Sequence, residues 1–293
     1  MTAFVQVAEL GSFAAAGRRL NMSPPGVTRA VATLEDRLGA RLFTRTTRSV
    51  RLTEAGQRYL EDCRRILADI HEAESSAAGA HGELRGQLSV TASQLFGRIF
   101  MLPIITRFLD QHEGVTIRTL FVDRVVNVVE EGIDVAVRIG ELPSSSLSAQ
   151  RVGSVRRIVC ASPEYLARHG APQSPEDLSR HSLVATTASQ SNVEWRFFAS
   201  GVARDVPVKP RLITTSNDAA IDAALGGWGL TRVLSYQVAP QVAAGRLKIV
   251  LPDFEPPPLP IHLLHAEGRR ASAKLRTFVD LAAELLRKDA LIN

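Results

Sequence analysis

The sequence predicts a chain of three consecutive parts: a small helical head that ends in a β-hairpin, one long helix, and a larger portion of two α/β lobes. The length of 293 residues exceeds the roughly 100–200 residues of a single domain. Apolar residues recur every three or four positions early in the chain, whereas short apolar strands alternate with helical segments later. We place the head at residues 1–58, the long helix and a hinge at 59–86, and the two lobes at 87–293, with 87–161 and 266–293 in the first lobe and 162–265 in the second.

Composition predicts a folded protein of a reducing compartment. Hydrophobic residues make up 45% and charged residues 22% of the chain, a balance typical of globular proteins. The two cysteines, Cys63 and Cys160, are too few for a disulfide scaffold or a four-cysteine zinc site. Every apolar stretch is interrupted before about 18 residues, and the N-terminus lacks the pattern of a signal peptide. We therefore expect a cytoplasmic protein that does not enter a membrane.

The positive charge is confined to the first fifth of the chain. Residues 1–65 contain 11 Arg, no Lys and 6 acidic residues, a net charge of +5 that equals the net charge of the whole chain. A compact basic segment beside a neutral body suggests a polyanionic partner for that segment. Composition alone leaves open that the asymmetry belongs to an ordinary solvated surface.

Helix start and stop signals divide the head into three helices. A first apolar face ends at Gly11, and Ser12 is a typical N-cap for a second helix over residues 13–20. Ser23 is the N-cap of the third helix, and Gly39 ends it.

The third helix has one apolar face and one polar face. It begins with Pro24 and Pro25, where the missing N–H group of proline costs no hydrogen bond. We expect a buried stripe of residues spaced by four, three and four positions: Val27, Val31, Leu34 and Leu38. Thr28 and Arg29 then lie on the solvent side of its first two turns.

A basic β-hairpin is expected after this helix, because apolar residues flank a polar turn within residues 41–52. A helix that presents polar groups from its first turns can enter the major groove of double-stranded DNA. Thr28 and Arg29 would face base edges or phosphates, and Arg45 and Arg48 in the hairpin would contact the backbone. The alternative is a small helical domain without a nucleic-acid role.

The long helix carries a repeating apolar seam. The seam residues recur at spacings of four, three, four and three, as expected for a two-stranded coiled coil that makes the protein a dimer: Tyr59, Cys63, Ile66, Ile70 and Ala73. The alternative is an amphipathic helix that packs on its own domain. Three glycines in residues 79–86 end the helix and predict a hinge.

The two lobes predict ligand-binding positions at the ends of strands. Alternating strands and helices indicate α/β layers with parallel strands, and ligands in such lobes bind beyond the carboxyl ends of strands, at helix N-termini. Ser93 and Gln94 follow the first strand and open a helix, and Ser216 and Asn217 do the same in the second lobe. Their hydroxyl, amide and N–H groups suit a small carboxylate or another anion. The alternative is that both serines are ordinary helix caps.

The ordered motifs of the first sixty residues resemble the N-terminal signature of LysR-type transcriptional regulators. The resemblance rests on these segments: 11–16, 23–31, 34–35, 38–39, 42–45 and 52–56. Less distinctive motifs at 134–140, 156–166 and 227–230 resemble the effector-binding module of the same regulators. Gly17 departs from the family pattern, in which a small alanine is commoner, and a glycine weakens a helix by roughly 1 kcal/mol.

This resemblance implies a winged helix-turn-helix that binds DNA, pairing through the long helix, tetramers on DNA, and a two-lobed effector domain like periplasmic solute-binding proteins. The expected DNA contacts include Ser12, Ser23, Pro24, Pro25, Thr28, Arg29 and the wing residues Arg45, Thr46, Thr47 and Arg48. Pro24 and Gly26 depart from the polar or alanine residues common there, which shifts the expected base contacts toward Thr28, Arg29 and the wing. In the family, positions like Ser93 line the effector pocket, as do the residues that follow the second and third strands, here Asp123, Ile139 and Gly140.

The function predicted is therefore that of a regulator of transcription, with two recognition helices that meet half-sites of a partly palindromic operator about one helical turn apart. No phosphate-binding loop, zinc-protease motif or nucleophile elbow occurs in the sequence, so we expect no cofactor, no metal and no enzymatic activity. The rival hypothesis is a two-lobed solute-binding protein or enzyme whose N-terminal domain serves only assembly.

Overall fold

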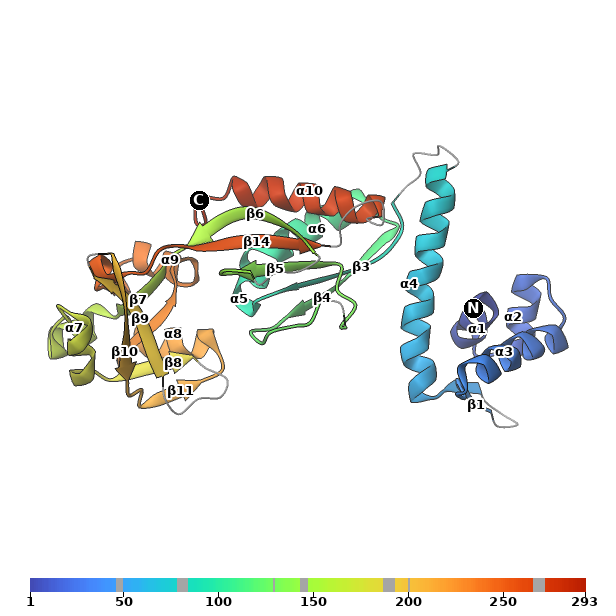
Figure 1. Ribbon diagram of the computed structural model, residues 1–293, viewed down its shortest axis with the longest axis horizontal. Coiled ribbons are helices and arrows are strands. Elements are labelled where there is room, and N and C mark those ends of the chain that lie inside the picture. Colours follow the sequence, from blue (N-terminus) through green and yellow to red (C-terminus); the bar gives the residue numbers. More distant parts are fainter. Residues whose placement is uncertain are drawn as a thin grey trace. The chain divides into compact units, whose positions relative to one another are not determined.

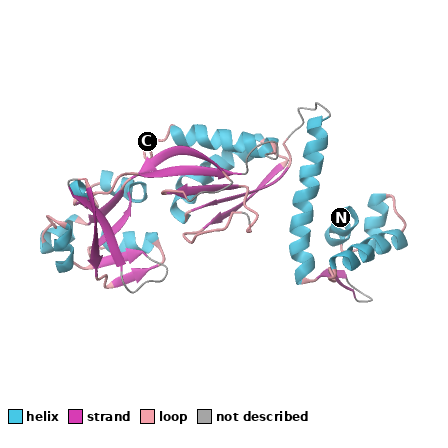
Figure 2. Cartoon of the chain, viewed as in Figure 1, coloured by secondary structure: helices cyan, strands magenta, loops and turns pink. Residues whose placement is uncertain are grey.

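The computed structural model describes the chain at residues 1–45, 50–77, 84–128, 130–142, 147–186, 193–199, 201–265 and 272–293. The chain forms two compact units, Met1–Gln87 with Gly114–Thr116 and Leu88–Glu113 with Ile117–Asn293. The helices and strands of both units are drawn in Figures 1 and 2. Within the residues described, no helix is both long and apolar enough to cross a membrane.

Three short helices build the head as the sequence predicts: α1 (Thr2–Leu10), α2 (Phe13–Leu20) and α3 (Pro24–Leu38). The Ser12 hydroxyl accepts a hydrogen bond from the Ala15 amide, and the Ser23 hydroxyl accepts one from the Gly26 amide, each at 3.2 Å. Gly11 and Gly39 end α1 and α3 in the left-handed conformation that glycine adopts without strain. The caps therefore set the lengths of these helices.

A hairpin and a long helix complete the first unit: β1 (Phe43–Arg45), β2 (Val50–Leu52) and α4 (Glu54–Ala77). The hairpin is antiparallel, with Phe43 opposite Leu52. The apolar core of the first unit joins these elements, because the cluster that holds the wholly buried Phe4, Val27, Val31 and Cys63 also includes residues of α2 and of the hairpin. Leu38 was predicted to belong to the buried stripe of α3, but this residue is 40% exposed because it is the last residue of the helix.

A first mixed sheet has the strand order β4-β3-β5-β14-β6. Its strands are β3 (Gly86–Ala92), β4 (Val115–Phe121), β5 (Val135–Ile139), β6 (Ser148–Val155) and β14 (Leu259–His265). The associated helices are α5 (Gln94–Phe96), the π-helix η1 (Gly97–Met101), α6 (Leu102–Gln111) and α10 (Ala273–Arg287). Phe108 of α6 and Phe278 of α10 meet edge to face with ring centroids 5.2 Å apart, which joins these two helices (Figure 1). We call this sheet and its helices the first lobe.

A second mixed sheet has the order β11-β8-β12-β7-β13. Its strands are β7 (Arg157–Ala161), β8 (Leu183–Thr186), β11 (Leu212–Thr214), β12 (Leu230–Leu234) and β13 (Lys248–Val250). A separate antiparallel hairpin consists of β9 (Val193–Ala199) and β10 (Val202–Val208). The helices are α7 (Pro163–His169), η2 (Pro175–Arg180), α8 (Asn217–Leu225), α9 (Ser235–Ala243) and η3 (Pro252–Phe254). We call this part the second lobe.

The lobe boundaries differ from the predicted ones at both ends. β7 was assigned to the first lobe, but it pairs with β12 and β13 of the second. β14 was assigned to the second lobe, but it lies between β5 and β6 of the first. The expectation of parallel strands holds for β3 with β5 and for β8 with its two neighbours, β11 and β12. By contrast, β7 and β14 pair antiparallel with their neighbours. A single strand's apolar pattern does not specify which sheet it joins, so the sequence left this undetermined.

Candidate functional site

The first turns of α3 present polar groups to solvent. Arg29 is exposed, and Thr28 is half-buried, with its hydroxyl donating to the Pro24 carbonyl at 3.0 Å. Pro24 and Pro25 are exposed in the first turn, which Ser23 caps. The buried residues Val27 and Val31 hold the opposite face of the helix against the head. This surface has the shape and chemistry of a helix that can lie in a DNA groove.

The other predicted contacts of the head have different roles or lie outside the described residues. Ser12 is half-buried and caps α2, so its hydroxyl is already engaged with the Ala15 amide. Thr46, Thr47 and Arg48 lie outside the described residues, and only the backbone of Arg45 is described, opposite Val50 in the hairpin.

Glu35 is a structural residue of this surface that the sequence reasoning missed. Its side chain is buried on α3, and one carboxylate oxygen accepts hydrogen bonds from the backbone amides of Leu42 at 2.7 Å and Phe43 at 3.1 Å. The other oxygen lies 3.5 Å from the exposed guanidinium of Arg41. Glu35 thus joins α3 to the first strand of the hairpin. Its position one residue after Leu34 gave no signal beyond an acidic residue beside an apolar stripe.

The predicted seam of α4 divides into two parts. Cys63 is wholly buried in the core of the head and Tyr59 packs on that core, its ring 5.5 Å from the ring of Phe4. Cys63 therefore cannot contact a partner chain, which corrects its assignment to the dimer seam. Ile66 is 37% exposed and Ile70 is 44% exposed, which is unusual for isoleucine. The side-chain environment of Ala73 lies outside the described residues.

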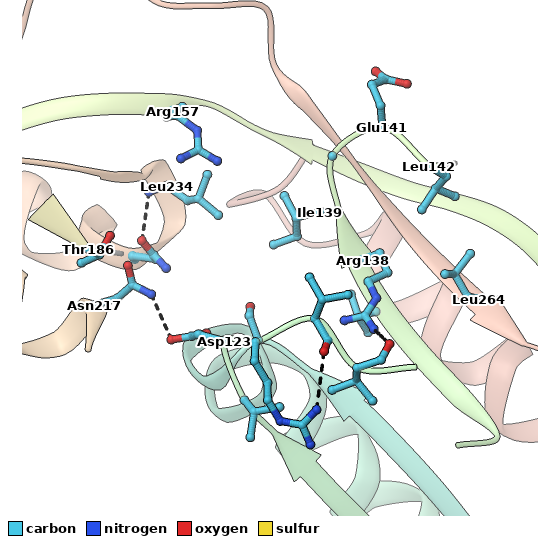
Figure 3. A pocket seen from close by; sticks show the side chains of 18 of the residues that line it. Asp123, Arg138, Ile139, Glu141, Leu142, Arg157, Thr186, Asn217, Leu234 and Leu264 are labelled. Atoms are coloured by element: carbon cyan, nitrogen blue, oxygen red, sulfur yellow. Dashed lines mark hydrogen bonds between the residues drawn. The ribbon is translucent and has the colours of Figure 1, made fainter. Parts of the chain in front are cut away.

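A pocket of about 670 Å³ lies between the two lobes of the second unit. First-lobe residues after β4 and β5 line one side, and second-lobe residues from β7, α8 and β12 line the other (Figure 3). Five of the seven residues predicted for effector binding line it: Ser93, Asp123, Ile139, Gly140 and Asn217. Gln94 and Ser216 do not. Gln94 is exposed, and the Ser216 hydroxyl caps α8 by accepting from the Ala219 amide at 3.2 Å, so the helix-cap alternative holds for Ser216.

Asp123 links the two lobes. One of its carboxylate oxygens accepts from the Gln94 amide at 3.0 Å, and the other accepts from the side-chain amide of Asn217 at 3.1 Å (Figure 3). The adjacent Asp218 forms an ion pair with Arg98 at 3.2 Å. Asn217 and Asp218, the first two residues of α8, therefore bind side chains of the first lobe beside the pocket.

Ser93 is not an ordinary helix cap. Its hydroxyl makes no cap hydrogen bond, and the amide of the next residue, Gln94, donates to Asp123. The hydroxyl oxygens of Ser93 and Tyr236 are both buried and without a well-formed hydrogen bond to the described residues. Burial raises the pKa of Tyr236 to about 12, and the nearby hydroxyl of Ser93 acts in the opposite direction. Ser93 is thus a polar group at the pocket with unused hydrogen-bonding capacity.

Among the described residues four arginines line the pocket, and none was predicted from the sequence. In the first lobe, Arg124 forms two hydrogen bonds with the Glu131 carboxylate, at 2.8 and 2.9 Å, and Arg138 donates to the Val126 carbonyl. The other two, Arg157 and Arg232, belong to neighbouring strands of the second lobe.

Comparisons with known proteins agree along nearly the whole chain. Residues 1–57 match the family model described as bacterial regulatory helix-turn-helix protein, lysR family, and residues 81–287 match the model described as LysR substrate binding domain. A helix-turn-helix transcriptional regulator of Xanthomonas campestris is 35% identical, over 98% of this chain and 85% of that protein. The transcriptional activator AaeR of Escherichia coli is 29% identical, over 96% and 91%.

Solved structures show the same likeness. The LysR-type regulator CrgA of Neisseria meningitidis is 31% identical, with a TM-score of 0.63 and 97% of each chain covered. The full-length virulence activator AphB of Vibrio cholerae is 26% identical, with the same TM-score and coverage of 96% and 97%. These relatives are regulators and not enzymes, which agrees with the predicted class of function and disfavours the rival hypothesis.

Proposed function

The chain belongs to the LysR family of DNA-binding transcriptional regulators, and from this we propose that it binds a partly palindromic operator as a dimer or tetramer in the cytoplasm and responds to a small anionic effector. In this proposal residues 1–58 bind DNA, residues 59–86 pair two chains and form a hinge, and residues 87–293 sense the effector. The recognition of DNA rests mainly on α3, whose Thr28 and Arg29 would reach base edges or phosphates.

One observation carries the DNA-binding part: the exposure of Arg29 on the first turns of a helix whose opposite face is fixed by buried valines. The wing residues Arg45, Thr46, Thr47 and Arg48 would add contacts to the backbone. A protein that neutralises phosphates with arginine releases counterions, so its affinity for DNA must fall steeply as salt rises.

A gel-shift titration with the DNA upstream of the gene, at 50 and 200 mM salt, tests this proposal. We expect Arg29→Ala to weaken binding by about tenfold or more. The matched control is Arg246→Ala, which removes an exposed arginine of the sensing unit. Binding by the native chain that does not respond to salt, or equal effects of the two substitutions, would contradict it.

The effector part rests on the pocket between the lobes. Its polar groups include the Ser93 hydroxyl and four arginines, which favour an anion such as a carboxylate. Because the Ser93 hydroxyl makes no helix-cap hydrogen bond, we propose that it contacts the effector directly. Calorimetry with the effector should give weaker binding for Ser93→Ala, whereas Ser216→Ala, which removes a cap outside the pocket, should leave the affinity unchanged.

A further inference from the structure

We propose that Arg157 and Arg232 together hold the acidic head group of an amphiphilic anion, and that the apolar body of this ligand lies against the first-lobe wall of the pocket. The head group is a carboxylate or a phosphoryl group. This inference rests on the sensing function proposed above and names the two residues and the ligand chemistry that serve it.

The register of the second sheet places the two arginines side by side. In the antiparallel pair of β7 and β12, Arg157 lies opposite Leu234 and Arg232 lies opposite Val159. Arg157 and Arg232 are therefore diagonal neighbours on one face of the sheet, the face that lines the pocket. Long side chains at such positions can converge on one anion, and the planar guanidinium group suits bidentate contact with carboxylate or phosphate.

Neither arginine has an ion-pair partner within the described ranges. Arg232 donates to the Arg196 carbonyl at 2.8 Å, and the carboxylate that acts on it, Asp205, is already bound by Arg196 through two hydrogen bonds of 2.8 and 2.9 Å. Desolvation lowers the pKa of Arg157 and of Arg232, and repulsion from Arg157 lowers the pKa of Arg232 further. Two adjacent cations without a counterion would be stabilised by a bound anion.

The carboxylates around the pocket are engaged or directed elsewhere. Glu131 is bound by Arg124, and Asp123 accepts from the Gln94 and Asn217 amides. The Glu141 carboxylate points away from Arg157 in Figure 3. No carboxylate within the described ranges therefore neutralises Arg157 or Arg232. The Arg232 guanidinium lies 5.8 and 5.6 Å from the ring centroids of Trp195 and Phe197, and its donors that do not bind the Arg196 carbonyl can still bind a ligand.

The opposite wall is mainly aliphatic. Its aliphatic residues include Val122, Val126, Val128, Ile139, Leu142 and Leu264, and its two arginines, Arg124 and Arg138, already bind Glu131 and the Val126 carbonyl. Figure 3 shows Ile139 on this side and Arg157 on the other, with the space of the pocket between them. A small dianion without an apolar part would leave the aliphatic wall hydrated, whereas an acid with an apolar body would shield that wall from water.

Calorimetry on the full chain with simple probes tests this arrangement. The acids are acetate, hexanoate, phenylacetate and phenyl phosphate, and the neutral counterparts are hexanamide and phenylacetamide. We expect hexanoate to bind at least about tenfold more tightly than hexanamide. Hexanoate should also bind more tightly than acetate, by roughly fourfold for each methylene that is buried. Phenyl phosphate against phenylacetate shows which head group is preferred.

Two substitutions and one control assign the binding to the arginine pair. Arg157→Gln and Arg232→Gln should each weaken hexanoate binding at least about tenfold. The control is Arg156→Gln, the preceding residue, whose exposed guanidinium pairs with Glu255 at 3.2 Å and does not line the pocket. If Arg232→Gln disturbs folding, Arg157→Gln still tests the inference, because the Arg157 side chain makes no hydrogen bond within the described part of the chain.

Equal affinity for hexanoate and hexanamide, unchanged binding by Arg157→Gln, or no binding of any acid would overturn the inference. The gel shift of the native chain is measured in the same preparation. Absence of DNA binding by the native chain would contradict the proposed regulator function. The calorimetric result would still decide whether the arginine pair binds an acid.

Discussion

The Glu35 carboxylate accepts a hydrogen bond from the backbone amide of Leu42 at 2.7 Å, so the helix proposed to enter DNA is tied directly to the strand that leads into the hairpin. The same oxygen also receives the Phe43 amide. Because the carboxylate is buried, these bonds fix the position of the hairpin relative to α3 more firmly than surface charges could.

Replacing Glu35 by alanine should loosen the hairpin. Two buried amides would lose their acceptor, at a cost of about 1–3 kcal/mol for each unsatisfied group. We expect faster hydrogen exchange at Leu42 and Phe43, measured by mass spectrometry on peptides of the head. Glu35→Gln keeps an amide oxygen and should recover part of the protection. The control is Asp36→Ala at the exposed neighbouring position, and an equal effect there would contradict the prediction.

Gly17→Ala should destabilise the head although alanine favours helices. A Cβ atom at position 17 would lie 2.7 Å from the Met22 carbonyl oxygen, closer than carbon and oxygen can approach. Overpacking costs about 1–3 kcal/mol, which outweighs the roughly 1 kcal/mol of helix propensity gained. Hydrogen exchange of α2 and α3 measures the result. Ala14→Gly, on the exposed face of α2, provides the propensity effect alone, and greater protection in Gly17→Ala than in the native chain would show the prediction to be wrong.

Ile70→Glu should weaken self-association. A second chain would cover the exposed Ile66 and Ile70, and burying an isoleucine stabilises a complex by about 1.5–3 kcal/mol. The dissociation constant of the dimer should rise at least about tenfold, as measured by sedimentation velocity. Gln57→Glu adds the same charge at an exposed position of α4 outside the seam. If both variants associate like the native chain, the dimer is formed elsewhere.

Both cysteine thiols should be unreactive in the folded protein. Burial raises the pKa of Cys160 to about 12 and also raises the pKa of Cys63 above its ordinary value of 9.0. Since the unfolded thiols ionise first as the pH rises, the free energy of unfolding should fall above about pH 9. Titration with a thiol-specific disulfide reagent at pH 8 should detect no fast-reacting thiol before denaturation and two thiols after it. A fast thiol in the native chain would contradict this.

Local signals predicted the head well, and long-range pairing limited the rest. Ser12, Ser23 and Gly39 act within a few residues of themselves, so sequence spacing alone placed α2 and α3. Cys63 continued an apolar repeat that reads equally well as a dimer seam or as a core position, and only its contacts with the head decide between them.

The pocket illustrates the same limit. Asn217 was predicted because it opens a helix after a strand, which is a local pattern, and Asp123 was implied by the family resemblance. Arg157 and Arg232 are separated by the length of most of the second lobe and become neighbours only through the pairing of β7 with β12. Their joint chemistry therefore required the sheet topology.

The chain crosses between the two lobes twice, before β7 and before β14, and these crossings have an evolutionary consequence. All strands of the second sheet come from one uninterrupted stretch of sequence, which leaves the first sheet after β6 and returns to it at β14. Recombination at these two crossings would exchange the wall that carries Arg157 and Arg232 as one contiguous segment, while the aliphatic wall is inherited unchanged. New head-group preferences could thus spread among relatives by one insertion event, without redesign of the first lobe.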